Sequence, residues 1–92
     1  MRPLFTGLVE ATGTVRDRSP LEGGAALVIE TPLADELEEG ESIALDGACL
    51  SVAGLLDGAF RVEAIRTTLS RTTLGAWEPG RAVNLERALR LG

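Results

Sequence analysis

The feature that most constrains the fold is a series of short segments in which apolar and polar residues alternate, separated by turns rich in Gly and Pro. Alternation with a period of two places successive side chains on opposite faces of a strand, so each segment can cover a core with one face. Six such strands are expected, at residues 5–16, 25–31, 42–46, 49–56, 59–65 and 81–87. Six short strands at regular spacing predict an all-β fold, a small antiparallel barrel that is closed or nearly closed.

The connections between these strands carry turn signals. Asp57-Gly58 is the clearest hairpin signal, because this dipeptide suits a two-residue turn with positive φ. Residues 19–24 are predicted to form another turn, since Ser, Pro and two glycines occur together there. Residues 72–80 show no regular pattern and are expected to be irregular, with a turn at Pro79-Gly80.

Short helices are expected in two places. Residues 32–39 are acidic and place apolar residues at helical intervals, and Gly40 is positioned to end the helix. Residues 66–71 lack strand alternation, and Thr67 or Thr68 could cap a helix there. One or two short helices are therefore expected. The acidic run at 35–39 is interpreted as a solvated face, with a metal or partner site as the alternative.

The segment from Asp46 to Val52 combines a turn, the single cysteine and a hydroxyl on one strand. Alternation predicts that Leu50 and Val52 face a core while Cys49 and Ser51 face the other way. Free cysteine is usually packed as a small hydrophobe, so simple packing is the alternative to a functional role for this strand.

The length of 92 residues predicts a single domain with one core. Such a domain has a thin margin of stability, and docking against a second copy or a second domain would widen it. Self-association is therefore expected.

The charge and composition exclude several classes of function. The net charge is −5, arginine is the basic residue type and histidine is absent, so there is no basic patch for nucleic acid or an anionic membrane. One cysteine cannot form an internal disulfide, and no apolar run approaches a membrane span, which favours the cytoplasm. Without histidine no zinc cluster is expected. Any chemistry would depend on hydroxyls, carboxylates, Cys49 and backbone amides.

Four blocks of sequence resemble the amino-terminal half of riboflavin synthase, in the order and spacing of that family. They are Phe5-Thr6-Gly7-Leu8-Val9-Glu10, Gly47-Ala48-Cys49-Leu50-Ser51-Val52, Thr68-Leu69-Ser70-Arg71-Thr72-Thr73-Leu74-Gly75 and Val83-Asn84-Leu85-Glu86-Arg87-Ala88. Each block alone is a weak signal. Four blocks in register cover nearly the whole chain and make the resemblance specific.

The resemblance implies a six-stranded Greek-key barrel. Riboflavin synthases carry two such barrels in tandem and a carboxy-terminal helix that drives trimer formation. They need no cofactor and catalyse a dismutation, in which one 6,7-dimethyl-8-ribityllumazine transfers a four-carbon unit to another, giving riboflavin and 5-amino-6-ribitylaminouracil. The active site forms between an amino-terminal barrel and a neighbouring subunit's carboxy-terminal barrel.

The chain, residues 1–92, resembles the first barrel only. Either it is a domain taken from a two-barrel protein or it is a single-barrel relative, and the sequence does not separate these. An isolated barrel is expected to bind ligand and to turn over poorly unless two copies pair as a homodimer.

The resemblance also implies which residues would form the site. The substrate-binding positions that match the family are Gly7, Leu8, Val9, Cys49, Leu50, Ser51, Glu63, Ala64, Ile65, Arg66, Thr67 and Thr68. Positions implicated at the reacting face are Phe5, Thr6, Ser42 and Cys49. Ser42 and Cys49 could position or activate a nucleophile or relay protons. A covalent role for Cys49 is disfavoured because the sequence places no base or cation beside it.

Two positions depart from the family pattern. Ser51 stands where threonine is common, which keeps the hydroxyl, and Thr67 stands where glutamate is common, which removes a carboxylate from the pocket rim. Two alternatives remain. The first is a non-catalytic module like the antenna lumazine proteins, which share the fold. The second is a flavin-binding barrel of the ferredoxin-reductase type, which is disfavoured because its Arg-x-Tyr-Ser signature needs a tyrosine and this chain has none.

Overall fold

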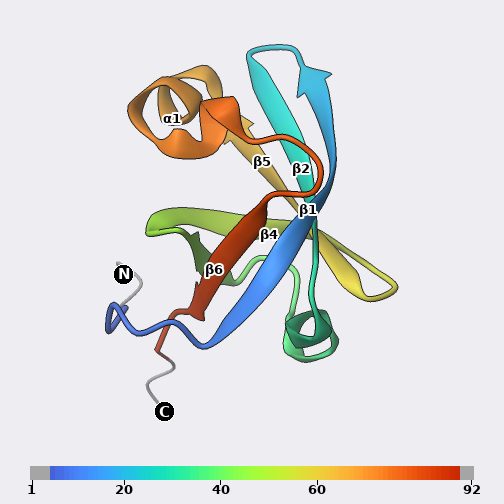
Figure 1. Ribbon diagram of the computed structural model, residues 1–92, viewed down its shortest axis with the longest axis vertical. Helices are drawn as coiled ribbons and strands as arrows, with labels where there is room; N and C mark the ends of the chain where they lie inside the picture. Colours follow the sequence, from blue (N-terminus) through green and yellow to red (C-terminus); the bar gives the residue numbers. More distant parts are fainter. Residues whose placement is uncertain (1–4, 90–92) are drawn as a thin grey trace.

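The computed structural model describes residues 5–89, and these form a closed six-stranded antiparallel barrel (Figure 1). The strands are β1 (Ala11–Leu21), β2 (Gly24–Glu30), β3 (Ser42–Leu45), β4 (Ala48–Leu56), β5 (Ala59–Ile65) and β6 (Ala82–Arg87). Their order around the barrel is β1-β2-β5-β4-β3-β6, and the first strand pairs with the last. The consecutive strands β3, β4 and β5 are flanked by β6 and β2, which is Greek-key connectivity. The predicted fold class is confirmed.

Three short helical segments connect the strands. They are the 3-10 helix η1 (Pro32–Glu36), the α-helix α1 (Arg66–Arg71) and the 3-10 helix η2 (Thr73–Ala76). Helix α1 packs against β2 and β5 at one end of the barrel (Figure 1). Within residues 5–89, no helix has the length and apolar character needed to cross a membrane.

The expected capping of α1 is wrong. Thr67 and Thr68 lie inside the helix, and the residue before it, Ile65, provides no side-chain cap. The backbone N–H of Arg66 instead donates to the carbonyl of Gly23, at 2.8 Å, so the β1–β2 turn satisfies an amide at the start of the helix.

The barrel interior is filled by the apolar face of every strand. The largest fully buried side chains are Trp77, Phe60, Leu27, Ile29, Ile43, Leu45, Leu74, Leu85, Val15, Val52, Val62 and Val83. The predicted alternation is confirmed on β2, where Leu27 and Ile29 are buried, and on β5, where Phe60 and Val62 are buried. The interior is therefore a packed core, and the polar faces of the strands point outward.

The segment from 72 to 80, expected to be irregular, contributes to this core. It contains η2, and its Leu74 and Trp77 are 0% and 1% exposed. The indole Nε1 of Trp77 donates to the Thr73 hydroxyl at 3.1 Å, and the guanidinium of Arg81 lies 4.4 Å from the indole ring centroid. Local periodicity missed this segment because its buried residues lie on a turn of 3-10 helix.

The first strand differs from its predicted range at both ends. Residues 5–10 are not in a strand, and β1 begins at Ala11. The strand also continues through Ser19 and Pro20, where a turn was expected, and the turn itself is at Glu22-Gly23, with Gly23 at φ 81°. Beyond Thr14, β1 is paired with β2 but no longer with β6, so the missing N–H of Pro20 can face an open edge.

Candidate ligand-binding site

The outer faces of the strands around β4 carry the polar and reactive side chains. Cys49 and Ser51 are exposed, whereas Val52 is 2% exposed and Leu50 is half-buried. The expected division of this strand into two faces is confirmed, and packing of Cys49 in the core is excluded. Among the described residues no hydrogen bond joins the Cys49 thiol to another side chain, so the structure shows no base poised to activate it.

One open pocket lies on the outside of the barrel where β4, β5 and α1 meet. It has a volume of about 430 Å³ and is lined by Cys49, Leu50, Ser51, Ala53, Glu63, Ile65 and Thr68. Six of these are predicted substrate-binding residues. Ala53 is the additional member. We call this the β4–β5 pocket.

The lining of the β4–β5 pocket combines apolar and polar groups. Ile65 and Ala53 provide apolar surface, and Ile65 is 66% exposed, whereas the half-buried Leu50 packs against the core. Ser51 and Thr68 provide hydroxyls, and the Glu63 carboxylate accepts a hydrogen bond from Arg61 beside it. A flat ligand with polar substituents would find both kinds of contact here.

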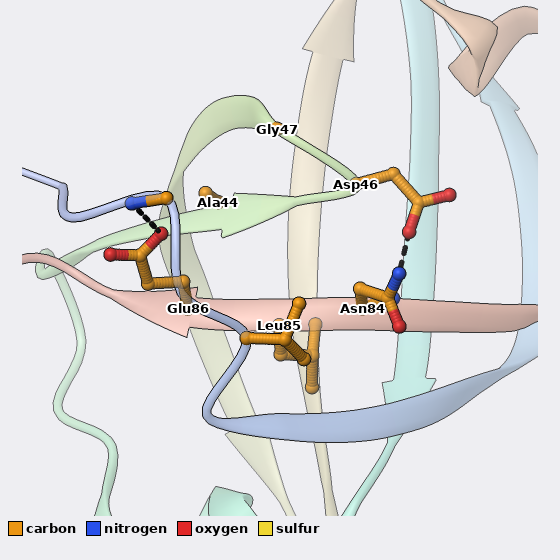
Figure 2. A pocket seen from close by; sticks show the side chains of 8 residues that line it. Ala44, Asp46, Gly47, Asn84, Leu85 and Glu86 are labelled. Carbon is orange, nitrogen blue, oxygen red and sulfur yellow. Dashed lines mark hydrogen bonds between the residues drawn. The ribbon is translucent and has the colours of Figure 1, made fainter.

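A second pocket, of about 240 Å³, lies where residues 7–9 cross the outside of β3 and β6 (Figure 2). It is lined by Gly7, Val9, Ala44, Asp46, Gly47, Asn84, Leu85 and Glu86. Gly7 and Val9 are predicted site residues. We call this the β3–β6 pocket.

Two carboxylates fix the walls of the β3–β6 pocket (Figure 2). Glu86 accepts the Gly7 N–H at 3.1 Å, and Asp46 accepts the Asn84 N–H at 2.7 Å. Asp46 has φ 48°, the one positive value at a non-glycine residue in the described part of the chain, and it also pairs with Arg81 at 2.8 Å. The Asp46-Gly47 turn is therefore held rigidly onto β6.

Strand register places the two pockets side by side on one surface. Ala44 on β3 lies opposite Cys49 on β4 and opposite Glu86 on β6. Two register positions away, and so on the same face, Ser42 lies opposite Ser51. Since directly paired residues project from the same face of a sheet, these five residues share the outer face.

The predicted reacting residues relate to this face as follows. Ser42 and Cys49 lie on it by register, and Thr6 reaches it by donating its N–H and its hydroxyl, the latter at 2.8 Å, to Glu86. Phe5 is half-buried. Three of the four residues therefore lie on or against one surface.

Other predicted residues line neither pocket. Leu8 is 71% exposed, Arg66 and Thr67 are exposed on α1, and Ala64 is 3% exposed with its side chain in the barrel interior. Of these four, Ala64 could offer a ligand only its backbone.

The seam between β3 and β6 is closed by a largely buried ion pair. The guanidinium of Arg87 bonds both carboxylate oxygens of Glu41, at 3.0 and 3.1 Å. The hydrogen bond to Glu41 raises the pKa of Arg87 above its ordinary value, with burial opposing the shift. Glu41 directly precedes β3, so this pair fixes the strand that carries Ser42.

Seven residues that line the two pockets were not predicted as site members: Ala44, Asp46, Gly47, Ala53, Asn84, Leu85 and Glu86. Glu86 is the most informative of them, because it is a charged residue on the outer face of β6 and is nevertheless only 8% exposed. Its partners are separated from it by 79 and 80 positions in the chain, so no local pattern could have indicated them.

The fold is a small antiparallel barrel with candidate ligand pockets on its outer surface. The model of the lumazine binding domain family matches residues 6–88 of the chain. The chain belongs to the lumazine-binding domain family.

The curated relatives are riboflavin synthases. The chain is 44% identical over 91 residues to the enzyme of Mycobacterium tuberculosis, a match that covers 97% of this chain and 45% of the relative. It is 42% identical over 88 residues to that of Schizosaccharomyces pombe, covering 94% of this chain and 42% of the relative. The chain thus spans less than half the length of these relatives.

The solved structures most similar in fold include LumP. The complex of LumP with 6,7-dimethyl-8-(1'-D-ribityl) lumazine matches with a TM-score of 0.84 and 23% identity, over 91% of this chain and 48% of LumP. The complex with riboflavin gives a TM-score of 0.85 at the same identity, over 91% and 46%. At this level of identity the likeness establishes the shared fold.

Proposed function

We propose that this chain binds 6,7-dimethyl-8-ribityllumazine and riboflavin on the outer face of the barrel, as one barrel of a riboflavin synthase. The observation that carries the proposal is the β4–β5 pocket, which gathers six residues matching the family's substrate-binding positions. Membership of the lumazine-binding domain family and the riboflavin synthase relatives support the same ligand class.

The chemistry of the pocket suits this ligand. A lumazine ring is flat, with amide-like donors and acceptors along one edge, so the exposed Ile65 could cover one face of the ring while strand amides meet its edge. The ribityl hydroxyls need short polar partners, and Ser51, Glu63 and Thr68 offer them.

The same surface suits the proposed dismutation. Loss of a proton from the 7-methyl group of a lumazine gives a delocalised anion, which fixed backbone dipoles can stabilise without a cationic side chain. Transfer of the four-carbon unit then needs two rings held face to face, and orientation alone can supply about 7 to 11 kcal/mol of a barrier. Ser42 and Cys49, on the outer face that carries both pockets, could guide a nucleophile or a proton.

We infer that residues 1–92 correspond to the amino-terminal barrel of a two-barrel enzyme. The chain matches 45% of the Mycobacterium tuberculosis relative, and the proposed reaction needs a second ring on a second barrel. The isolated chain should therefore bind lumazine and form riboflavin slowly, and pairing of two copies would raise the rate. A purely binding role like that suggested by LumP is less favoured, because the LumP match is 23% identical and the enzyme matches reach 44%.

Fluorescence titration of the ligands tests the binding proposal. We expect riboflavin and the lumazine to change their emission on addition of the chain at micromolar concentration. Ala53→Phe should abolish the change by filling the β4–β5 pocket, whereas Ala82→Phe, at an exposed strand alanine outside both pockets, should not. Wild-type protein that leaves both spectra unchanged would rule the proposal out.

A turnover assay separates the enzyme from the carrier. The chain is incubated with the lumazine, and riboflavin is followed by its absorbance over time. Slow formation that rises with the square of chain concentration would support paired barrels as the active unit. Tight binding with no riboflavin formed at any concentration would favour the carrier.

A further inference from the structure

Glu86 occupies an unusual position for a carboxylate on the outer face of a barrel strand. Its side chain is covered by the segment that precedes β1, and the residue is 8% exposed. It accepts three hydrogen bonds from that segment: from the Thr6 N–H, from the Thr6 hydroxyl at 2.8 Å and from the Gly7 N–H at 3.1 Å. Such a charge is stable at this burial because each oxygen is satisfied.

These bonds are the connection between residues 5–9 and the barrel. In the described part of the chain, every hydrogen bond from these residues to a strand ends on Glu86. The Leu8 N–H bonds to the Thr6 hydroxyl at 3.1 Å, so even this contact depends on the orientation that Glu86 gives to Thr6. The next hydrogen bond along the chain is donated by the Glu10 N–H to the Leu85 carbonyl, at 2.9 Å, just before β1 begins.

The hydrogen bonds between Glu86 and residues 6–7 lie close to the candidate site. Glu86, Ala44 and Cys49 form one row across β6, β3 and β4, so two strand spacings, about 10 Å, separate the carboxylate from the cysteine. Gly7 and Val9 are held beside this row as a wall of the β3–β6 pocket (Figure 2). Gly7 has φ 82°, a backbone conformation that glycine adopts without strain.

We propose that Glu86 is a positioning residue for ligand binding, which fixes the backbone of residues 6–9 at the edge of the ligand surface before the ligand arrives. The inference rests on the proposed lumazine and riboflavin binding. A segment already ordered in the free protein loses less conformational freedom on binding, and the affinity is correspondingly higher.

The test compares Glu86→Gln with Glu10→Gln. Glutamine keeps the size of Glu86 and has one accepting oxygen, so at least one donor of residues 6–7 loses its acceptor. Glu10 is the matched control: it belongs to the same segment, and its carboxylate accepts the Arg87 N–H on β6 at 2.7 Å, but it lines neither pocket. Ligand affinity is measured by riboflavin fluorescence, and backbone order by hydrogen exchange of individual amides.

We expect E86Q to raise the Kd for riboflavin by about tenfold, as loss of preorganisation predicts. Its Thr6 and Gly7 amides should exchange faster while those of β2 and β5 keep their wild-type rates, a pattern that general destabilisation would not give. E10Q should bind like wild type. If E86Q does not fold, Glu86→Asp keeps the charge on a shorter side chain and should give the same pattern.

Two results would overturn the positioning role alone. They are faster exchange of residues 6–7 in E86Q with an unchanged Kd, and an E10Q variant that loses as much affinity as E86Q. Wild-type protein that binds neither ligand would instead remove the proposed function, and the positioning role with it, so the two failures are distinguishable.

Discussion

The inner and outer faces of the same strands differ in this barrel: inner side chains form the core, and outer side chains line the pockets. On β5, Phe60 and Val62 are fully buried in the interior, while Ile65 is 66% exposed and lines the β4–β5 pocket. On β4, Val52 faces the core, while Cys49 is exposed and lines the same pocket. Because the interior is filled, the two pockets lie outside it. Under the proposed function, stability and ligand recognition depend on alternate residues of one strand and should be separable by substitution.

The largest expected effect tests the inner face. Phe60→Ala removes a fully buried aromatic side chain and should lower the free energy of unfolding by about 3 to 5 kcal/mol, enough to unfold much of so small a domain. Ile65→Ala on the outer face should change stability by less than about 1 kcal/mol and weaken riboflavin binding instead. Urea denaturation measures the free energy of unfolding, and fluorescence titration measures riboflavin affinity. Equal losses of stability in Phe60→Ala and Ile65→Ala would contradict the division between the two faces.

A substitution between two strand backbones should affect both faces. A Cβ at Gly24 would lie 2.0 Å from the carbonyl oxygen of Ala64, and no side-chain movement relieves that contact. Gly24→Ala should cost about 1 to 3 kcal/mol of stability and also weaken ligand binding, since Gly24 pairs with Ile65. Gly54→Ala is the control, because its Cβ would meet nothing closer than 3.9 Å. An unchanged melting temperature in Gly24→Ala would contradict this prediction, because it would show that the backbones of β2 and β5 can move apart to admit the Cβ at no cost in stability.

The smallest expected effect belongs to the outer face alone. Ser51→Ala removes one hydroxyl of the β4–β5 pocket and should weaken riboflavin binding by about 1 kcal/mol, roughly fivefold in Kd, with an unchanged melting temperature. Ser19→Ala, at an exposed serine of β1 outside both pockets, should leave affinity unchanged. If Ser51→Ala also binds like wild type, the Ser51 hydroxyl makes no contact with the ligand.

The strands and their two faces could be predicted from the sequence where the pattern is local. Alternation on β2 and β5 and the Asp57-Gly58 turn each depend on neighbouring residues, and all three agree with the structure. The order of the strands is not local, because β1 pairs with β6 and β2 with β5 across the chain. The resemblance to a known family implied Greek-key connectivity, and the structure gives the order itself.

The part of the site formed by residues 6–9 could not be predicted in the same way. Those residues alternate like a strand, but their donors meet a carboxylate 79 or 80 positions away instead of a neighbouring strand. The Cys49 strand was identified correctly as two-faced because its turn, its apolar residues and its polar residues are contiguous. The hydrogen bonds from Thr6 and Gly7 to Glu86 join residues far apart in the sequence, so no local pattern indicates them.

Strand β6 (Ala82–Arg87) pairs with both β1 and β3, so it is the strand that closes the barrel. While the protein is being synthesised, a chain lacking that strand is a curved sheet whose two margins offer unsatisfied amides to any other strand nearby. The order of events on the ribosome is thus set by topology: β1 to β5 can assemble early, and protection against aggregation comes only when the last strand emerges.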